Sequence, residues 1–595
     1  MTLDIAITLA VLAITIAAIS REIFGPDVLL AAGLVAVLAA GVIDPATALA
    51  GFGNPALATI ASMLVISAAL RSTGALEGAG KRVFGETRSL PRALLRLTGL
   101  TAGLSAAVSN TAVVAMAVPV AQSWAKRVRV SPSKLLIPLS YASILGGMTT
   151  VIGTSTNLVS DGLLQSYGFP GLGFFELSLV GIPAVLIGVL YLSLAAPRLL
   201  KDRVPVYETG SDVRRYLAEL RLTEPSAIIG KTVTEAGLRH LPGLFLVRIE
   251  RRTGVISPVG PEIRLFAGDR LTFAGNVDTI VDLRKLRGLA PEADESENES
   301  LAPSQSAGWS LNEAVVSPGS ELVGSTIREA SFRSRYNAAI VAVHRRGSQL
   351  TGRIGDIVLR PGDTLLLEAA SGFTRTFRHS RDFYLVSQVV ASTSPRHDKL
   401  PVALGVLAGV ILLAALDVLP IVTASMLGGV AMIAFRCLSP GDAKRSIDWS
   451  VLLMIGSALG LAAALRASGA ADLLAAGIVG AARGLGPVGV LGAIFLAALI
   501  LTEFVTNTAA VALMFPIALS AAASLGVDSR PFVVAATLAA SLSMATPIGY
   551  HTNLMVYGPG GYSFGDFAKV GVPLQIVVGL LALLLIPIVW PLSPA

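Results

Sequence analysis

The chain has 595 residues, of which 53% are hydrophobic and only 14% are charged, and its mean hydropathy is +0.71. Ordinary soluble domains carry about 25% charged residues, so this composition excludes a soluble globular protein and indicates a polytopic membrane protein. The single cysteine, Cys437, excludes a disulfide framework and a multi-cysteine metal site, and the net charge of +7 comes largely from basic residues beside hydrophobic segments, which argues against nucleic-acid binding.

Residues 1–200 are predicted to form a first membrane unit. The first apolar run has no basic segment before it, so we expect it to stay as a helix rather than to be cleaved as a signal. A Gly/Ala-rich stretch at about 98–123 lies between two basic patches, and if both are cytoplasmic it enters and leaves the membrane on one side as a re-entrant hairpin. Spanning helices of roughly 17–25 residues are expected near 3–19, 26–42, 54–70 and 175–196, with a broken helix around 153–157.

Residues 204–398 differ from the segments on either side, because charges are frequent, hydrophobic residues alternate with period two and no run is long enough to span a membrane. Basic residues just before this block place it in the cytoplasm by the positive-inside rule. Ile229-Gly230-Lys231-Thr232 and Val323-Gly324-Ser325-Thr326 are each followed at the same distance by a Gly-Asp pair. This repeat predicts two small α+β modules, 204–291 and 309–390, joined by an acidic disordered linker near 292–308.

Residues 399–595 are predicted to form a second membrane unit with the same order of elements. The signs of the flanking charges give each unit three helices, a hairpin and two helices, and they orient the two units oppositely. About ten spanning helices with both termini outside follow from this count. The expected elements lie near 400–416, 420–436, 449–466, 487–524 (hairpin), 530–558 (broken helix) and 569–591.

Two polar clusters occur in both membrane units. Ser109-Asn110-Thr111-Ala112 corresponds to Thr506-Asn507-Thr508-Ala509, and Gly153–Leu158 corresponds to Gly549–Leu554. Asn110 and Asn507 lie 397 residues apart, and Asn157 and Asn553 lie 396 apart. Polar, Gly/Pro-interrupted segments at corresponding positions of two inverted repeats indicate the binding site of a secondary transporter.

The residue types in these clusters suit a small cation and an anion. Ser, Thr and Asn offer neutral oxygens, a broken helix frees backbone carbonyls for Na⁺, and half-helix N-termini offer N–H groups to an anion. We therefore predict one cation site where each hairpin tip meets its broken helix, beside a shared anion site that Asn110-Thr111 and Asn507-Thr508 reach from opposite sides. Helix packing by small polar residues is the alternative, and it is much weaker for two matched clusters than for one.

Two further residues have open roles. Glu503 is either a carboxylate for a proton or cation, or a cap of the hairpin near the outer surface. His551 either contacts the anion or serves as a packing and hydrogen-bonding group.

At these motifs the chain resembles the divalent anion:sodium symporter family of the ion transporter superfamily, which carries a Ser-Asn-Thr motif at each of two opposed hairpin tips. The segment Thr546–Tyr562 is similar to the branch of that family that transports sulfate or sulfur compounds. That branch also inserts two TrkA C-terminal (RCK-C) modules between its halves, as residues 204–398 do here. Two departures concern Ser155-Thr156-Asn157 and His551-Thr552-Asn553, where dicarboxylate carriers have Pro-Pro-Asn, and His551, where the sulfate branch has Gln.

The resemblance also implies ligands. For Na⁺ these are Ser105, Ser109, Asn110, Gly146, Gly147 and Asn157 in the first unit, and Thr502, Thr506, Asn507, Ala545 and Asn553 in the second. For the substrate they are Asn110, Thr111, Thr154, Thr156, Asn507, Thr508, Pro547, Gly549, His551 and Thr552.

The implied function is Na⁺-coupled symport of a divalent oxyanion, with sulfate favoured, by a homodimer that works through an elevator motion in the bacterial inner (cytoplasmic) membrane. The inserted modules are then regulatory and bind a nucleotide such as cyclic di-AMP, or they are a dimerisation scaffold with no ligand. A glycine-rich phosphate loop is missing from both modules, so an ATPase role is unsupported.

Other functions fit parts of the sequence. A dicarboxylate symporter and an H⁺-coupled exchanger of the same superfamily are the alternatives, and Glu503 would serve the exchanger. Thr546-Pro547-Ile548-Gly549-Tyr550 faintly resembles a potassium-channel filter, but its proline and its single copy argue against a channel. An enzyme is rejected because no nucleophile–base pairing and no metal-binding cluster is present in the sequence.

Overall fold

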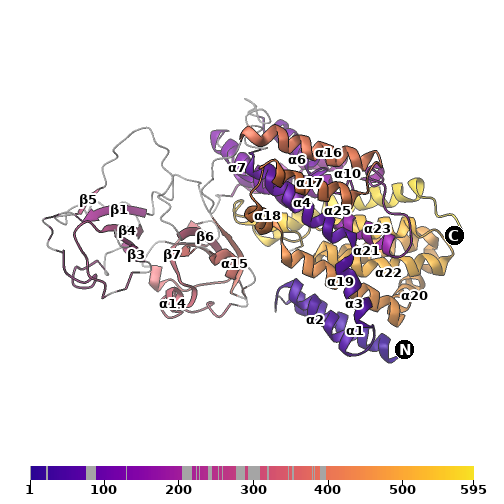
Figure 1. Ribbon diagram of the computed structural model, residues 1–595, viewed down its shortest axis with the longest axis horizontal. Coiled ribbons are helices and arrows are strands. Elements are labelled where there is room, and N and C mark those ends of the chain that lie inside the picture. The colour runs from indigo at the N-terminus through magenta and orange to yellow at the C-terminus, as the bar shows by residue number, and fades with distance from the viewer. Residues whose placement is uncertain are drawn as a thin grey trace. The chain divides into compact units, whose positions relative to one another are not determined.

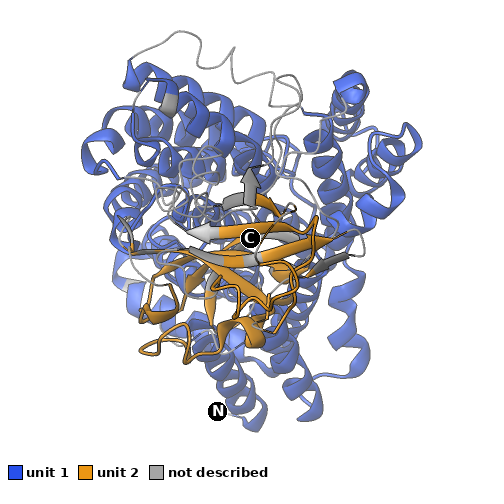
Figure 2. Ribbon diagram, turned by 90° about the vertical axis from the view of Figure 1, so that its left-hand side faces the viewer, with its two compact units in different colours: residues 1–203, 394–595 blue, residues 204–393 orange. Residues whose placement is uncertain are grey.

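The chain is built of two compact units, Met1–Arg203 together with Ser394–Ala595, and Val204–Thr393 (Figure 2). Within the described part of the chain, the named elements of the first unit are helices, and the strands lie in the second unit. This computed structural model describes every residue except 1, 22–23, 75–88, 129, 204–216, 223, 225, 227, 239–243, 252–253, 257–258, 261, 276–288, 292–308, 318–319, 346–347, 351–353, 371, 378–379, 381, 389–396, 548 and 595.

The first half of the membrane unit begins with four helices and ends with two. Between them lie a helical hairpin and a broken helix. The elements are α1 (Leu3–Ser20), α2 (Pro26–Ala39), α3 (Pro45–Ala50), η1 (Gly51–Gly53), α4 (Pro55–Ser72), the hairpin α6 (Leu90–Ser105) and α7 (Asn110–Val128), η2 (Pro132–Lys134), the broken helix α8 (Leu136–Gly147) and α9 (Ser155–Ser166), α10 (Ser178–Leu194) and α11 (Ala196–Leu199).

The second half has a similar order, with five α-helices before its hairpin and one helix after its broken helix. Its elements are η5 (His397–Lys399), α16 (Leu400–Ala415), α17 (Ile421–Ala434), α18 (Pro440–Ser446), α19 (Trp449–Ser468), α20 (Ala470–Ala482), η6 (Arg483–Leu485), the hairpin α21 (Gly486–Phe504) and α22 (Asn507–Leu525), the broken helix α23 (Arg530–Ser541) and α24 (His551–Tyr557), and α25 (Phe564–Val589).

Contacts between the halves occur in exchanged pairs. Helix α2 packs on α19, and its counterpart α17 packs on α4, the counterpart of α19 (Figure 1). In the same way α9 packs on α22, and α24 packs on α7. Because each contact recurs with the halves exchanged, the membrane unit is a pair of structurally equivalent repeats, as the matched clusters predict.

Seven helices in the described part of the chain are long and apolar enough to cross a membrane. They include both arms of the second hairpin, which the sequence-based count of about ten does not treat as spans. That count instead adds the two broken helices and the shorter helices α2, α10 and α17, which have 14, 17 and 14 residues. A 14-residue helix is only about 21 Å long, so these elements fall below a length criterion for spanning a hydrocarbon core of about 30 Å.

The two helix breaks have the same backbone geometry. Thr154, which precedes α9, has φ −140° and ψ 148°, and Tyr550, which precedes α24, has φ −142° and ψ 137°. Both residues are therefore extended, and the chain re-enters a helix immediately after them. The same backbone conformation therefore interrupts the helix in both repeats, which a frayed helix end would not produce.

The inserted unit contains two five-stranded antiparallel sheets with the same strand order, β3-β2-β4-β1-β5 and β8-β7-β9-β6-β10. The first sheet comprises β1 (Leu217–Leu222), β2 (Leu244–Arg251), β3 (Gly254–Ile256), β4 (Arg270–Gly275) and β5 (Leu289–Pro291). The second comprises β6 (Trp309–Val316), β7 (Ala338–Arg345), β8 (Ser348–Gln349), β9 (Thr364–Ala370) and β10 (Phe383–Gln388), with the short helices α14 (Phe332–Tyr336) and α15 (Phe373–Phe377) and η4 (Ile354–Asp356) beside it.

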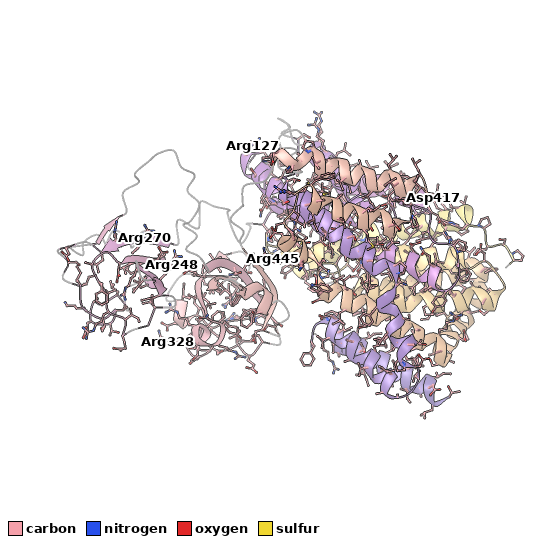
Figure 3. All side chains as sticks on the ribbon, viewed as in Figure 1. Arg127, Arg248, Arg270, Arg328, Asp417 and Arg445 are labelled. Carbon is pink, nitrogen blue, oxygen red and sulfur yellow. The ribbon has the colours of Figure 1, made fainter. Side chains whose placement is uncertain are left out.

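The repeated Gly-Asp pairs have one structural role in both sheets. Asp269 accepts hydrogen bonds from Arg251, with an ion-pair distance of 2.8 Å, and Asp363 pairs with Arg345 at 2.7 Å. The preceding glycine has a positive φ in both copies, which allows the turn that presents the carboxylate. Arg248, labelled in Figure 3, is buried, and its Nη1 lies 3.4 Å from Glu368 Oε1 on β9 of the second sheet. The linker predicted at 292–308 lies outside the described residues.

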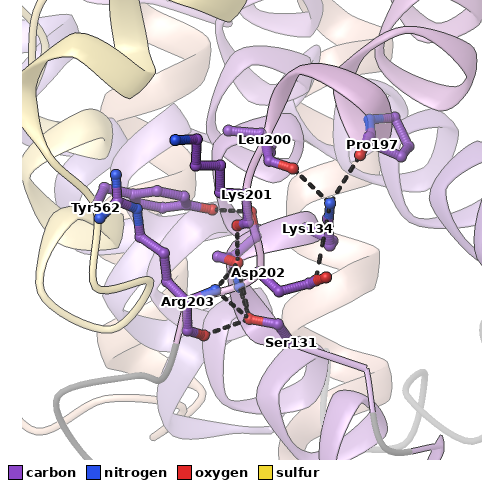
Figure 4. Close-up of polar contacts among 9 residues, drawn as sticks. Ser131, Lys134, Pro197, Leu200, Lys201, Asp202, Arg203 and Tyr562 are labelled. Carbon is purple, nitrogen blue, oxygen red and sulfur yellow. Dashed lines mark hydrogen bonds and ion pairs between the residues drawn. The ribbon is translucent and has the colours of Figure 1, made fainter. Parts of the chain in front are cut away.

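Hydrogen bonds and ion pairs connect the C-terminal end of the first membrane half to residues of the second half near the start of α25 (Figure 4). Lys134 Nζ donates to the backbone carbonyls of Pro197 and Leu200 and lies 3.7 Å from Asp202 Oδ1. Arg203 forms an ion pair of 2.6 Å with Asp566, the capping residue of α25, and Tyr562 donates to the Ser133 carbonyl at 2.6 Å. The segment that leads to the inserted unit is therefore fixed to the loop of the second half.

Candidate ion and anion site in the hairpins and broken helices

One asparagine spans each helix break. Asn157 Nδ2 donates to the carbonyls of Gly147 at 3.2 Å and Thr150 at 2.8 Å. Asn553 Nδ2 donates to the carbonyls of Ser543 at 3.3 Å and Thr546 at 3.1 Å. Both asparagines are fully buried. They satisfy carbonyls that the broken helix leaves without helical partners, and they fix the direction of the remaining ones.

The first hairpin presents Asn110 at the start of α7, next to this break. With the amide turned so that both of its ends are satisfied, Nδ2 donates to the Ser143 carbonyl at 3.0 Å and the Gly153 carbonyl at 3.3 Å, and it meets Ser105 Oγ at 2.5 Å. Asn110 is 3% exposed. The hairpin tip and the broken helix of the first repeat thus form one buried polar cluster.

The second hairpin presents Asn507 in the corresponding way. Thr502 Oγ1, one turn earlier, donates to Asn507 Oδ1 at 3.1 Å and lies 2.7 Å from the Ala540 carbonyl. Asn507 Nδ2 is buried and has no hydrogen-bond partner among the residues that the structure describes. The Ser105–Asn110 and Thr502–Asn507 pairs occupy equivalent positions, although Asn110 donates to its hydroxyl and Asn507 accepts from its own.

Glycines allow the first hairpin and its broken helix to approach closely. A Cβ at Gly147 would lie 2.5 Å from the side-chain amide of Asn110, and a Cβ at Gly146 would collide with the main chain of Ala102. Neither glycine has a positive φ. They are needed for space, which brings the backbone of α8 against the tip of the hairpin.

Two tyrosine and serine contacts join the repeats. The Tyr550 hydroxyl donates to the Asn110 amide oxygen at 2.6 Å in the orientation above and lies 3.2 Å from Thr154 Oγ1. Ser140 Oγ on α8 reaches Thr552 Oγ1 at 2.9 Å and Asn553 Oδ1 at 2.7 Å. The hairpin and broken helix of one repeat are therefore hydrogen-bonded to the broken helix of the other.

The structure brings most of the predicted residues into these clusters. Thr154, Thr156, Thr508 and Thr552 are buried beside the breaks or on α22, and Pro547 and Gly549 are buried within the second break. Ser109 donates to Ser67 Oγ at 3.3 Å, and Thr506 contacts Met454. Ala545 is half-buried, and its N–H donates to Glu503 Oε1 at 3.1 Å.

Two predicted substrate residues are exposed and do not lie in the buried clusters. Thr111 and His551 are exposed in this conformation, while Asn110 and Thr552 beside them are buried. They lie at the first turns of α7 and α24, so their side chains are accessible from outside the clusters.

Sequence reasoning missed Tyr550, Ser140 and Gln575. Gln575 Nε2 donates to Glu503 Oε1 at 2.6 Å. Tyr550 aligns with Thr154 when the repeats are superposed at 396 residues, and this substitution of a long side chain for a short one was a signal that could have found it. Ser140 carries no motif. Its role depends on a contact with residues more than 400 positions away, which sequence spacing does not reveal.

The donor set fits Na⁺ better than a transition metal. Thr156 Oγ1 and Asn157 Oδ1 are buried oxygens without hydrogen-bond partners in the described part of the chain. No group of three or more His, Cys, Asp and Glu side chains that could hold a metal ion occurs among the described residues. Neutral hydroxyl, amide and carbonyl oxygens are ligands for hard cations.

Comparisons with known proteins identify relatives over nearly the whole chain. The family described as citrate transporter matches residues 10–539. A Chlamydomonas reinhardtii protein whose name refers to the response to sulfur deprivation is 38% identical over 94% of this chain and 97% of its own length. An uncharacterized transporter of Synechocystis is 33% identical over 99% of this chain and 98% of its own length.

A third relative is named for its substrate. Sodium/sulfate cotransporter 1 of Chlamydomonas reinhardtii is 26% identical over 96% of this chain and 88% of its own length. Among solved structures, the GsuK RCK domain was matched over 27% of this chain and 62% of its own, at 15% identity and a TM-score of 0.14, which is too low to carry an argument.

Proposed function

The chain belongs to the citrate transporter family, of the divalent anion:sodium symporter type, and from this premise we propose that it is a Na⁺-coupled symporter of a divalent oxyanion, with sulfate favoured. Membership makes it a multi-pass membrane transporter of anions rather than an enzyme. The choice of sulfate is supported by the relatives named sodium/sulfate cotransporters, which this chain matches over most of its length.

The observation that carries the proposal is the twofold recurrence of one buried contact set. Each repeat has a hydroxyl–asparagine pair at the hairpin, Ser105–Asn110 or Thr502–Asn507, facing a break held by Asn157 or Asn553. Each set would hold one Na⁺ through side-chain and main-chain oxygens. Two cations placed on either side of one anion neutralise a divalent charge, so cation and anion binding support each other.

The anion would lie between the two sets. Asn507 offers an amide whose N–H groups have no partner among the described residues, and Asn110 would exchange its bonds to the Ser143 and Gly153 carbonyls for the anion. Thr154 and Thr552 offer hydroxyls, and the N-terminus of α9 offers backbone N–H groups. These neutral donors bind an oxyanion without a salt bridge, which permits its release after the cations leave.

We also propose that the hairpins and broken helices move together as an elevator body in a homodimer. The proposal rests on the buried hydrogen bonds between repeats, Tyr550–Asn110 and Ser140–Thr552, which join the moving elements into one body. The inserted unit would be a pair of cytoplasmic RCK-C regulatory modules, and the membrane would be a bacterial inner membrane. A nucleotide such as cyclic di-AMP is a candidate regulatory ligand.

The experiment is uptake of labelled sulfate by proteoliposomes that hold the purified full chain. Inward Na⁺, K⁺ and H⁺ gradients of equal size are compared, and unlabelled sulfate, thiosulfate, succinate and citrate serve as competitors. The proposal expects uptake that only Na⁺ drives and that sulfate competes. Uptake driven by the H⁺ gradient would show that the coupling ion is H⁺ and not Na⁺. Competition by succinate or citrate alone would show that the substrate is a carboxylate and not sulfate.

A further inference from the structure

The two repeats differ by one carboxylate next to the helix break. Glu503 follows Thr502 near the end of α21, and the equivalent position in the first repeat, after Ser105, is Ala106. An intramembrane carboxylate carries a desolvation cost of several kcal/mol unless it is compensated. Glu503 therefore requires a partner that the first repeat does not require.

One oxygen of Glu503 is fully engaged. Oε1 accepts hydrogen bonds from Met544 N at 3.1 Å, Ala545 N at 3.1 Å and Gln575 Nε2 at 2.6 Å. Gln575, on α25, is itself fixed because it also donates to the Leu542 carbonyl at 2.5 Å. Three N–H donors on one oxygen suit a carboxylate and hold it in a single orientation.

The other oxygen is buried and has no partner. Glu503 Oε2 lacks a hydrogen bond to any described residue, although its solvent-accessible surface is below 1 Å². A Cβ built on Gly549 would lie 3.2 Å from this oxygen, 3.1 Å from Thr546 Oγ1 and closer still to Ser543 Oγ. Three side-chain oxygens thus lie close to Gly549, and two of them have hydrogen bonds: Ser543 Oγ donates to the Thr502 carbonyl at 3.3 Å, and Thr546 Oγ1 accepts from Gly549 N at 3.0 Å. We call Glu503 Oε2, Ser543 Oγ and Thr546 Oγ1 the second-repeat cradle.

Space, rather than backbone conformation, explains the glycine. Gly549 is not among the glycines with positive φ, so a side chain is excluded there by the cradle oxygens and not by dihedral strain. The missing side chain lets one carboxylate oxygen and two hydroxyl oxygens approach the same backbone, and oxygens of these kinds are ligands for a small hard cation.

The first repeat provides the internal comparison. At Gly153, the counterpart of Gly549, the three nearest atoms to a built Cβ all belong to the main chain of Gly147. Thr150, the counterpart of Thr546, donates its hydroxyl to the Ala106 carbonyl at 2.5 Å. The same fold therefore places main-chain atoms next to this glycine in one repeat and side-chain oxygens in the other.

We propose that the second-repeat cradle is a cation site of its own, which takes Na⁺ in addition to the two sites that the repeats share. The identity of the ion rests on the proposed function, whereas the site rests on the geometry of Glu503, Ser543 and Thr546. The bound cation compensates the carboxylate, and the carboxylate gives this site a charge that the two shared sites lack.

The test is a Na⁺ titration of the thermal stability of the purified full chain, with choline chloride keeping the ionic strength constant. Glu503→Gln removes the charge, and Gly549→Ala retains the carboxylate but adds a methyl group that displaces Ser543 Oγ from the cradle. Thr150→Val is the matched control in the first repeat. Sulfate is absent, so the result does not depend on whether sulfate is the substrate.

The proposal expects the Na⁺ concentration for half-maximal stabilisation to rise about 10- to 100-fold in Glu503→Gln and in Gly549→Ala, with a lower Hill coefficient, and to stay unchanged in Thr150→Val. If Glu503→Gln does not fold, Gly549→Ala decides alone. Unchanged Na⁺ titrations in the folded variants would overturn the cradle, even if Na⁺-driven sulfate uptake stands. Loss of Na⁺ binding in them would support it, even if sulfate uptake fails.

Discussion

Asn157 and Asn553, 396 residues apart, make the same pair of hydrogen bonds to the carbonyls that each helix break releases. The match extends to the extended residue that precedes each second half-helix. Two amides that share a backbone task at equivalent positions make the breaks rigid, and rigid carbonyls can present fixed oxygens to a cation.

Asn157→Ala and Asn553→Ala should both destabilise the membrane unit. Each variant leaves two buried carbonyls without their donor, which costs about 1–3 kcal/mol. We expect lower melting temperatures for both variants without added Na⁺, measured by intrinsic fluorescence in detergent. An unchanged melting temperature for either one would show that its break is held by other contacts.

Tyr550→Phe tests the contact between repeats. The variant removes the hydroxyl that bonds Asn110 and neighbours Thr154, so we expect the KM for the anion to change by about 5- to 10-fold while folding is retained. Tyr557→Phe is the control, because its ring stacks on Phe567 away from these contacts. Equal kinetics for the two variants would remove Tyr550 from the site.

Arg203→Ala tests the network that closes the first membrane half. Asp566 is 2% exposed, so loss of the 2.6 Å ion pair leaves a buried charge with only its Ser563 partners, and we expect a loss of about 3 kcal/mol. The exposed pair Arg445–Asp442 supplies the control, since Arg445→Ala should cost about 0–1 kcal/mol. Thermal unfolding of the full chain compares the two, and equal losses would contradict the assignment.

The inserted unit should become less stable as the pH rises. Burial on β6 raises the pKa of Glu313 from 4.5 to about 7. Between these values the folded unit holds a proton that the unfolded chain releases, so stability is greatest below pH 4.5 and falls until about pH 7, by about 3 kcal/mol in total.

Amide hydrogen exchange in β6 and β9, corrected for the intrinsic effect of pH, measures this dependence in the full chain. Glu313→Gln should remove it and should protect β6 more strongly at pH 8. A variant that keeps the wild-type pH dependence would assign the effect to another group, such as the neighbouring buried Glu368 on β9.

The sequence predicted the fold class well because the information lies in short, repeated segments. The pairs Asn110/Asn507 and Asn157/Asn553 identify the repeats by spacing alone, and the Gly-Asp pairs identify the duplicated sheets. Length and composition locate the helices, although α2 and α17 are shorter than the apolar runs suggested.

The contacts between repeats could not be predicted in this way. Tyr550 reaches Asn110 across 440 residues, and Ser140 reaches Asn553 across 413. Neither contact follows from local periodicity, because it depends on how the two repeats pack. The sequence predicts that Glu503 is an intramembrane carboxylate, but its orientation toward Gly549 depends on three hydrogen bonds that only the structure gives.

Na⁺-driven sulfate uptake in Asn110→Ala and Asn507→Ala shows whether the two equivalent hairpin sites act on one substrate. The control is Asn337→Gly, which removes an exposed amide from a left-handed position in the inserted unit. We expect each site variant to reconstitute as a folded protein and to lose Na⁺-driven uptake, while the control transports normally. Wild-type uptake in either site variant alone would contradict a shared site.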